Sequence, residues 1–126
     1  MTAANADRLL AALALLAGAG GVALSAAAAH LGTGASLDTA ARFMLVHAAA
    51  LLAVMAAIHA GLLHATVARI AAWALLVGLL LFSGDLSVRS LYGVAPLPMA
   101  APSGGFLLIG GWCLAAVAAL LPNRVR

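Results

Sequence analysis

The sequence contains no lysine, no glutamate and no glutamine, and charged residues make up only 7% of its 126 positions. Soluble globular domains carry about 25% charged residues, so this chain cannot cover a soluble fold with a solvated surface. The arginines that give the net charge of +3 are scattered along the chain. A nucleic-acid-binding face needs clustered basic side chains, and we therefore expect no nucleic-acid partner.

Cysteine is nearly absent as well. Cys113 is the only one in the sequence, which excludes an intramolecular disulfide and a cysteine-based metal site. There is no Gly-rich phosphate loop ending in Gly-Lys-Ser, and no serine stands at motif spacing from a histidine. We therefore expect no bound metal or other cofactor and no enzymatic activity.

What the sequence does contain is apolar residues, which form 67% of the chain and gather in four long runs. A helix that crosses the hydrocarbon core of a bilayer needs about 20 mostly apolar residues, and in lipid it satisfies its own backbone hydrogen bonds. The runs cover residues 9–29, 43–63, 70–91 and 104–121. The sequence therefore predicts an all-α membrane protein, a four-transmembrane-helix bundle, formed by a single domain over residues 1–126.

The distribution of arginine predicts the orientation of these spans. An even number of spans places both termini on one side, together with Arg8, Arg69, Arg124 and Arg126, and leaves Arg42 and Arg89 on the other. The positive-inside rule then predicts that both termini are cytoplasmic. As an alternative, residues 8–29 also resemble a cleaved secretory signal, but signal cores have only about 7–15 apolar residues.

Small residues are the second abundant class, since alanine alone exceeds a quarter of the chain. Helices in lipid associate through close packing, which small side chains permit. Stripes with four-residue spacing include Gly21 and Ser25 in the first span and Gly111 and Ala115 in the last. We expect these residues to form helix–helix seams, either within one chain or between copies. The alternative is that helix preference alone filled these stripes with small residues.

Five of the ionisable residues in or beside the spans fall toward one end of the predicted bundle, and such groups are costly in hydrocarbon and usually face the bundle or a cavity. Counting along the predicted helices places all five in the outer third of the membrane, opposite the termini. They are His30, Arg42, His47, Asp85 and Arg89. The sequence therefore predicts one polar cluster built from three helices.

Simpler interpretations of these residues stay open. Asp85 and Arg89 are four positions apart and can neutralise each other along one helix face. Arg42, at a helix end, can extend to the lipid headgroups. His47 can be an interior histidine bonded to a backbone carbonyl or a serine, and His30 can be an interfacial residue.

Several segments, taken in order, resemble a known family. They are Ser25 to His30, Arg42-Phe-Met-Leu-Val-His47-Ala, Leu81-Phe-Ser-Gly84, and Pro102-Ser-Gly-Gly105 followed by Gly111-Trp112. The chain resembles the small four-helix inner-membrane family of unknown function that includes bacterial YgdD, with eukaryotic relatives. The resemblance implies a multi-pass membrane protein without an assigned reaction or catalytic residues. The chain departs from the family pattern at Asp85, where we expect serine, and at Arg89, where we expect an apolar residue.

Three classes of function fit these observations. The first is a structural or accessory interaction protein whose partners are the lipid bilayer and either a larger membrane complex or a second copy. The second is a small-solute or proton-conducting membrane protein that uses His47 and Asp85, because intramembrane acids and histidines can relay protons. The third is a redox subunit that binds haem or quinone between His30 and His47.

Overall fold

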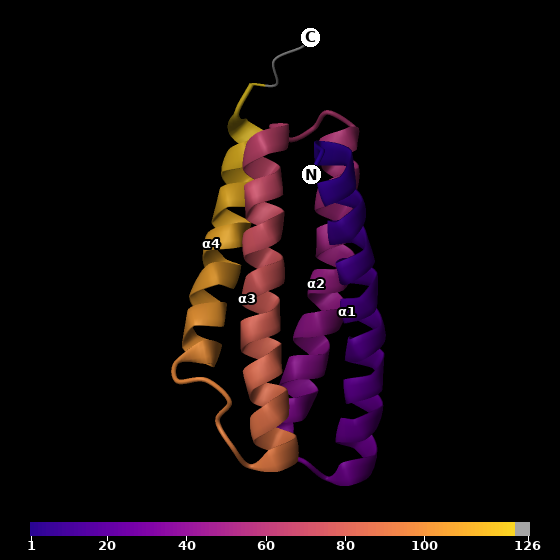
Figure 1. Ribbon diagram of the computed structural model, residues 1–126, viewed down its shortest axis with the longest axis vertical. Helices are drawn as coiled ribbons and strands as arrows, with labels where there is room; N and C mark the ends of the chain where they lie inside the picture. Colours follow the sequence, from indigo (N-terminus) through magenta and orange to yellow (C-terminus); the bar gives the residue numbers. More distant parts are fainter. Residues whose placement is uncertain (123–126) are drawn as a thin grey trace.

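The structure, a computed structural model, describes residues 1–122 and contains four helices in that range. They are α1 (Ala3–Leu31), α2 (Ala35–His59), α3 (Ala65–Tyr92) and α4 (Ala100–Leu120). The helices run up and down along one long axis, so α1 begins and α4 ends at the same end of the molecule (Figure 1). All four are long and apolar enough to cross a membrane. The predicted all-α fold with four membrane-spanning helices is confirmed.

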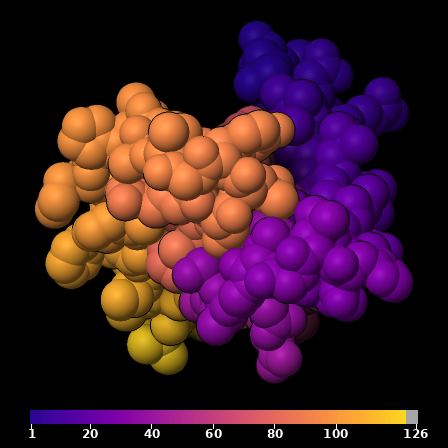
Figure 2. All heavy atoms as spheres, turned by 90° about the horizontal axis from the view of Figure 1, so that it is seen from below, coloured from indigo at the N-terminus to yellow at the C-terminus, as the bar shows by residue number. Residues whose placement is uncertain are grey.

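The helices pack mainly in chain order. α1 packs on α2, α2 on α3 and α3 on α4, and a smaller contact joins α1 to α3. In the end view, the surface is hollowed between the indigo start of α1 and the orange region where α3 leads into α4 (Figure 2). The four helices therefore form a curved row, in which α1 and α4 are the two outer members. Each outer helix presents a large share of its surface to the surrounding lipid.

The helix boundaries differ from the apolar runs. α2 begins at Ala35 rather than residue 43 and ends at His59 rather than residue 63. It ends early because Gly61 adopts a left-handed backbone (φ 75°) that turns the chain toward α3. It starts early because Asp38 and Arg42 pair along one helix face and keep this polar turn helical.

The other three helices extend beyond the predicted runs at one or both ends. α1 covers residues 3–31 against a predicted 9–29, and α3 covers 65–92 against 70–91. α4 covers 100–120 against 104–121. The polar first turn of α1 stays helical because the Thr2 side chain accepts a hydrogen bond from the backbone N–H of Asn5 at 3.3 Å. Hydropathy marks the part of a helix in hydrocarbon, whereas the helix itself continues until its cap.

The small residues of both stripes face neighbouring helices of the same chain. A Cβ atom at Gly21 would lie 2.9 Å from Cγ of Leu45 in α2, and one at Gly111 would lie 2.8 Å from Cγ of Leu75 in α3. Ala115 is buried, and Ser25 is half-buried. These contacts bring α1 against α2 and α4 against α3.

The tightest crossing is between α3 and α4. A Cβ atom at Gly104 would lie 2.5 Å from the backbone nitrogen of Phe82 and 2.7 Å from the carbonyl oxygen of Gly78. Glycine at both Gly78 and Gly104 therefore lets the two backbones touch. This crossing sets α4 beside Phe82 and so positions the groove described below.

Candidate functional site

Each of the three aspartates in the sequence lies against one arginine. The pairs are Asp7–Arg69 (2.8 Å), Asp38–Arg42 (2.8 Å) and Asp85–Arg89 (2.6 Å). The second and third pairs join residues four positions apart on one helix, whereas the first joins α1 to α3. Each pair removes a net charge that would be costly near hydrocarbon.

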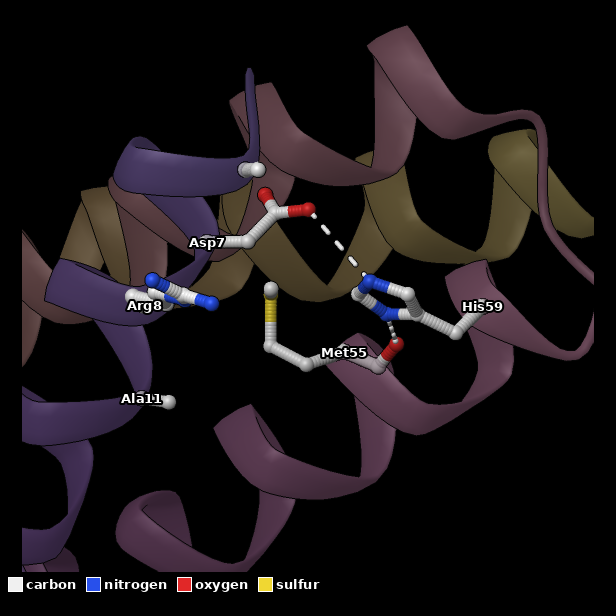
Figure 3. Close-up of a pocket in the computed structure, with 6 residues that line it drawn as sticks. Asp7, Arg8, Ala11, Met55 and His59 are labelled. Atoms are coloured by element: carbon white, nitrogen blue, oxygen red, sulfur yellow. Dashed lines mark hydrogen bonds and ion pairs between the residues drawn. The ribbon is translucent and has the colours of Figure 1, made fainter. Parts of the chain in front are cut away.

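The Asp7–Arg69 pair closes the end of the bundle where the chain begins. Nε and Nη2 of Arg69 donate to the two carboxylate oxygens of Asp7 at 2.8 and 2.9 Å, and Asp7 is only 7% exposed. Nε2 of His59 lies 3.7 Å from the same carboxylate, and its Nδ1 lies 2.8 Å from the carbonyl oxygen of Met55 (Figure 3). Because this carbonyl can only accept, Nδ1 carries a proton. The pair is bidentate, the strongest geometry for such contacts.

A cavity of about 390 Å³ lies beside this pair, between α1 and α2. Asp7, Arg8, Met55 and His59 line it together with two alanines (Figure 3). Sequence reasoning missed this site because it used Arg8 and Arg69 only to orient the spans. A usable signal was present. Asp7 and Arg69 stand near the starts of the first and third helices, which run in the same direction and so place both residues at one membrane surface.

The Asp85–Arg89 pair lies toward the opposite end, near the end of α3. Asp85 is 2% exposed, whereas the Arg89 side chain is 47% exposed. Oδ2 of Asp85 accepts from Nε of Arg89, but Oδ1 is buried and has no hydrogen-bond partner within residues 1–122. A cavity of about 250 Å³ lies beside Asp85, between α3 and the α3–α4 connection. Arg89 therefore bonds only one of the two carboxylate oxygens of Asp85.

An aromatic groove lies between α2 and α4, with α3 behind it. Its volume is about 380 Å³, and we call it the α2–α4 groove; it is lined by Phe43, His47, Phe82, Gly105, Leu108, Ile109 and Trp112. The ring centroid of Phe43 lies 4.6 Å from that of Phe82 and 5.5 Å from that of His47. The groove is therefore a mostly apolar hollow with one histidine on its wall.

Both ring nitrogens of His47 are engaged. The indole N–H of Trp112 donates to Nε2 of His47 at 3.1 Å, so Nε2 must be the accepting, unprotonated nitrogen. Nδ1 lies 2.9 Å from the carbonyl oxygen of Phe43, which can only accept, so Nδ1 carries the proton. The geometry therefore describes a neutral imidazole with both of its hydrogen bonds made.

Of the five residues of the expected polar cluster, only Asp85 and Arg89 bond each other within residues 1–122. Asp85 and Arg89 are brought together, Arg42 pairs with Asp38, and His30 is exposed in the last turn of α1. His47 lies at the midpoint of α2 rather than near its start, because α2 begins at Ala35 instead of residue 43. Within residues 1–122, no hydrogen bond or ion pair joins His47 to Asp85 or His30.

The two arginines of α3 are about as far apart along the helix as a typical hydrocarbon core is thick. Arg69 and Arg89 are 20 positions apart, which corresponds to about 30 Å along a helix, the thickness of a typical hydrocarbon core. Each bonds an aspartate, Asp7 or Asp85, near one end of α3. The predicted orientation of the spans also depends on Arg124 and Arg126, which lie outside the described residues.

Among residues 1–122, no three histidine, cysteine or acidic side chains gather where they could hold a metal ion. The fold and these contacts define a multi-pass membrane protein whose aspartates are paired with arginines within the chain. The chain belongs to a family of proteins of unknown function, DUF423, whose pattern matches residues 17–105. The match includes His47 and Asp85 and leaves out Asp7 and Trp112. Comparisons with curated proteins and with solved structures find no match.

Proposed function

We propose that this protein is a structural or accessory interaction protein of the bacterial inner membrane, with cytoplasmic termini and no reaction of its own. Its partner is an apolar transmembrane helix of a larger membrane complex, which lies in the α2–α4 groove. The observation that carries this proposal is the groove itself. It is a mostly apolar hollow between two non-neighbouring helices.

The chemistry of the groove suits a helix rather than a polar ligand. His47 and Trp112 satisfy each other, so their polar atoms are already engaged. Recognition then depends on shape and van der Waals contact, which is how helices associate in lipid. Gly105 lines the groove with open space above its Cα, so a partner backbone can approach closely. Ile109 and Trp112 are exposed and supply apolar area.

The geometry favours this role over proton or solute conduction. A relay through His47 needs a proton donor to reach its unprotonated nitrogen, but Nε2 of His47 already accepts from the indole N–H of Trp112. Asp85 is held by Arg89 rather than by a histidine. No direct hydrogen bond joins these two groups within residues 1–122.

The geometry also favours the accessory role over a haem-binding or quinone-binding one. His30 lies in the last turn of α1, next to the start of α2, whereas His47 lies 12 positions into α2, about 18 Å along its axis. Two ligands of one haem iron must lie at the same depth. These histidines do not.

The experiment uses a photo-crosslinking amino acid at position 109, on the groove, in native membranes. We expect one partner polypeptide to be crosslinked. Gly105→Leu should abolish the crosslink by filling the groove. Gly110→Leu is the matched control, because Gly110 is also a glycine of α4 with open space above it but does not line the groove. Crosslinks to lipid alone, or equal crosslinking in both variants, would overturn the proposal.

A further inference from the structure

The cavity beside Asp85 is separate from the α2–α4 groove. One carboxylate oxygen of Asp85 lacks a hydrogen-bond donor in the described part of the chain. Oδ1 of Asp85 is a carboxylate oxygen, buried and without a donor within residues 1–122. Such an oxygen is costly to bury unless a hydrogen-bond donor reaches it. The adjoining cavity of about 250 Å³ has room for a small donor group. The site therefore calls for a compact ligand that carries an N–H or O–H group.

The neighbouring arginine has hydrogen-bond donors that are not used within residues 1–122. Arg89 bonds Asp85 through Nε alone, and its two Nη groups have no partner within residues 1–122. The side chain is about half exposed. A guanidinium with free Nη groups is well suited to bind a phosphate. The pair thus combines an unbonded acceptor, the buried Oδ1 of Asp85, with free donors on the half-exposed side chain of Arg89.

The pair lies near the end of a membrane-spanning helix, within reach of the lipid headgroups. Arg89 is three positions before Tyr92, the last residue of α3, and so lies about 5 Å from the helix end. Asp85 is one turn deeper. The apolar residues Leu80, Leu81 and Leu97 form part of the cavity wall and suit the glycerol and acyl region of a lipid.

We propose that Asp85 and Arg89 bind the phosphoethanolamine headgroup of a membrane lipid. The ammonium group donates to Oδ1 of Asp85, and the phosphate accepts from the Nη groups of Arg89. A phosphocholine headgroup has the same charges but no N–H bond, and its three methyl groups make it wider. The site therefore selects ethanolamine lipid over choline lipid.

The test measures binding of phosphatidylethanolamine and phosphatidylcholine with identical acyl chains to the purified protein, by native mass spectrometry from detergent. A hydrogen bond to a charged group corresponds to about tenfold to hundredfold in affinity. We expect a preference of that size for the ethanolamine lipid. Asp85→Asn should reduce it to about onefold, since it removes the negative charge and replaces one of the two accepting oxygens with an NH2 group, which only donates.

Two further variants distinguish binding at this site from a loss of folding and from the loss of any one charge. Gly84→Leu fills the cavity without touching the charges and is expected to fold, because a Cβ atom at Gly84 meets nothing within 4 Å. It should also abolish the preference, and it decides the question if Asp85→Asn does not fold. Asp38→Asn is the matched control, because Asp38–Arg42 is an exposed pair of the same spacing. It should keep the preference.

Equal binding of both lipids by the unmodified protein would overturn the proposal, as would a preference that survives Gly84→Leu. Glycerophosphoethanolamine, the water-soluble headgroup without acyl chains, distinguishes the source of the ligand. We expect it not to displace the lipid at equal concentration, because it cannot contact the apolar wall. Full displacement would overturn the assignment to a lipid. The crosslinking at position 109 tests a different cavity, so either proposal can fail alone.

Discussion

The indole N–H of Trp112 donates to Nε2 of His47, and this 3.1 Å bond joins α4 to α2. α4 otherwise packs mainly on α3, so the bond is one of the few that tie these two helices together. It also fixes the tautomer of His47, whose other nitrogen faces the carbonyl oxygen of Phe43. The wall of the α2–α4 groove is held in place by this pair.

Trp112→Phe should therefore destabilise the protein by about 1–2 kcal/mol, because Nε2 of His47 is left without a donor in an apolar setting. Thermal unfolding in detergent measures the loss. Trp73→Phe is the matched control, since the Trp73 indole has no hydrogen-bond partner within residues 1–122. Equal losses in the two variants would show that the bond to His47 contributes nothing.

The two partners of the Asp85–Arg89 pair should differ in their effects. Arg89→Ala leaves a buried carboxylate without its partner and should cost about 3 kcal/mol. Asp85→Ala leaves an arginine that can extend to water or headgroups and should cost about 1 kcal/mol. The double replacement should resemble Asp85→Ala alone. If Arg89→Ala is the milder single change in equilibrium unfolding, the burial of Asp85 does not govern the energetics of this pair.

The Asp7–Arg69 pair should stabilise the protein more than the exposed Asp38–Arg42 pair. It is bidentate, joins two helices and places Asp7 in a buried position. A double-mutant cycle with alanine should give a coupling of about 1–3 kcal/mol for Asp7 and Arg69. The same cycle on Asp38 and Arg42 should give less than about 1 kcal/mol. Similar couplings would contradict the role of Asp7 as a link between α1 and α3.

Two adjacent glycines of α4 should respond in opposite directions to alanine. Gly104→Ala forces a methyl group against the backbone of α3 and should destabilise by about 1–3 kcal/mol. Gly105→Ala meets open space and should be neutral or stabilise by up to about 1 kcal/mol, since alanine favours helix. Thermal unfolding of the two variants side by side checks this. Loss at Gly105 equal to that at Gly104 would contradict the close crossing.

The orientation of the spans is tested with topology reporters. A reporter fused after Arg126 should report the cytoplasm, and one inserted near Gly34 should report the periplasm. Both follow from the excess of arginine on the terminal side. Reversed signals would invert the orientation and leave the four helices unchanged.

Local features of this fold were predictable from the sequence, because their causes lie within one helix. Four apolar runs gave four helices, and the four-residue spacing of Asp85 and Arg89 indicated their pairing. The boundaries of α2 were not predictable from hydropathy, since a neutralised polar turn at Asp38 continues the helix beyond the apolar run. That difference alone places His47 at the midpoint of α2 rather than near its start.

The long-range contacts were not predictable, because their partners lie far apart in the chain. His47 and Trp112 are 65 positions apart, and Asp7 and Arg69 are 62 positions apart. Helix direction places both members of the second pair at one surface, but it does not specify which faces of α1 and α3 meet. The crossing at Gly78 and Gly104 depends on the same helix rotations.

The spacing of Arg69 and Arg89 has a consequence for the choice of membrane. Each guanidinium group is bonded to an aspartate of the same chain, so neither arginine side chain can extend freely toward the lipid headgroups. In a bilayer thicker than about 30 Å, one of the two guanidinium groups must enter hydrocarbon or the lipids must thin around the helix. Hydrophobic mismatch of this kind costs fractions of a kcal/mol for each ångström. The protein should therefore partition into membranes of ordinary thickness and avoid thicker ones, which fluorescence partitioning between bilayers of different acyl-chain length can measure.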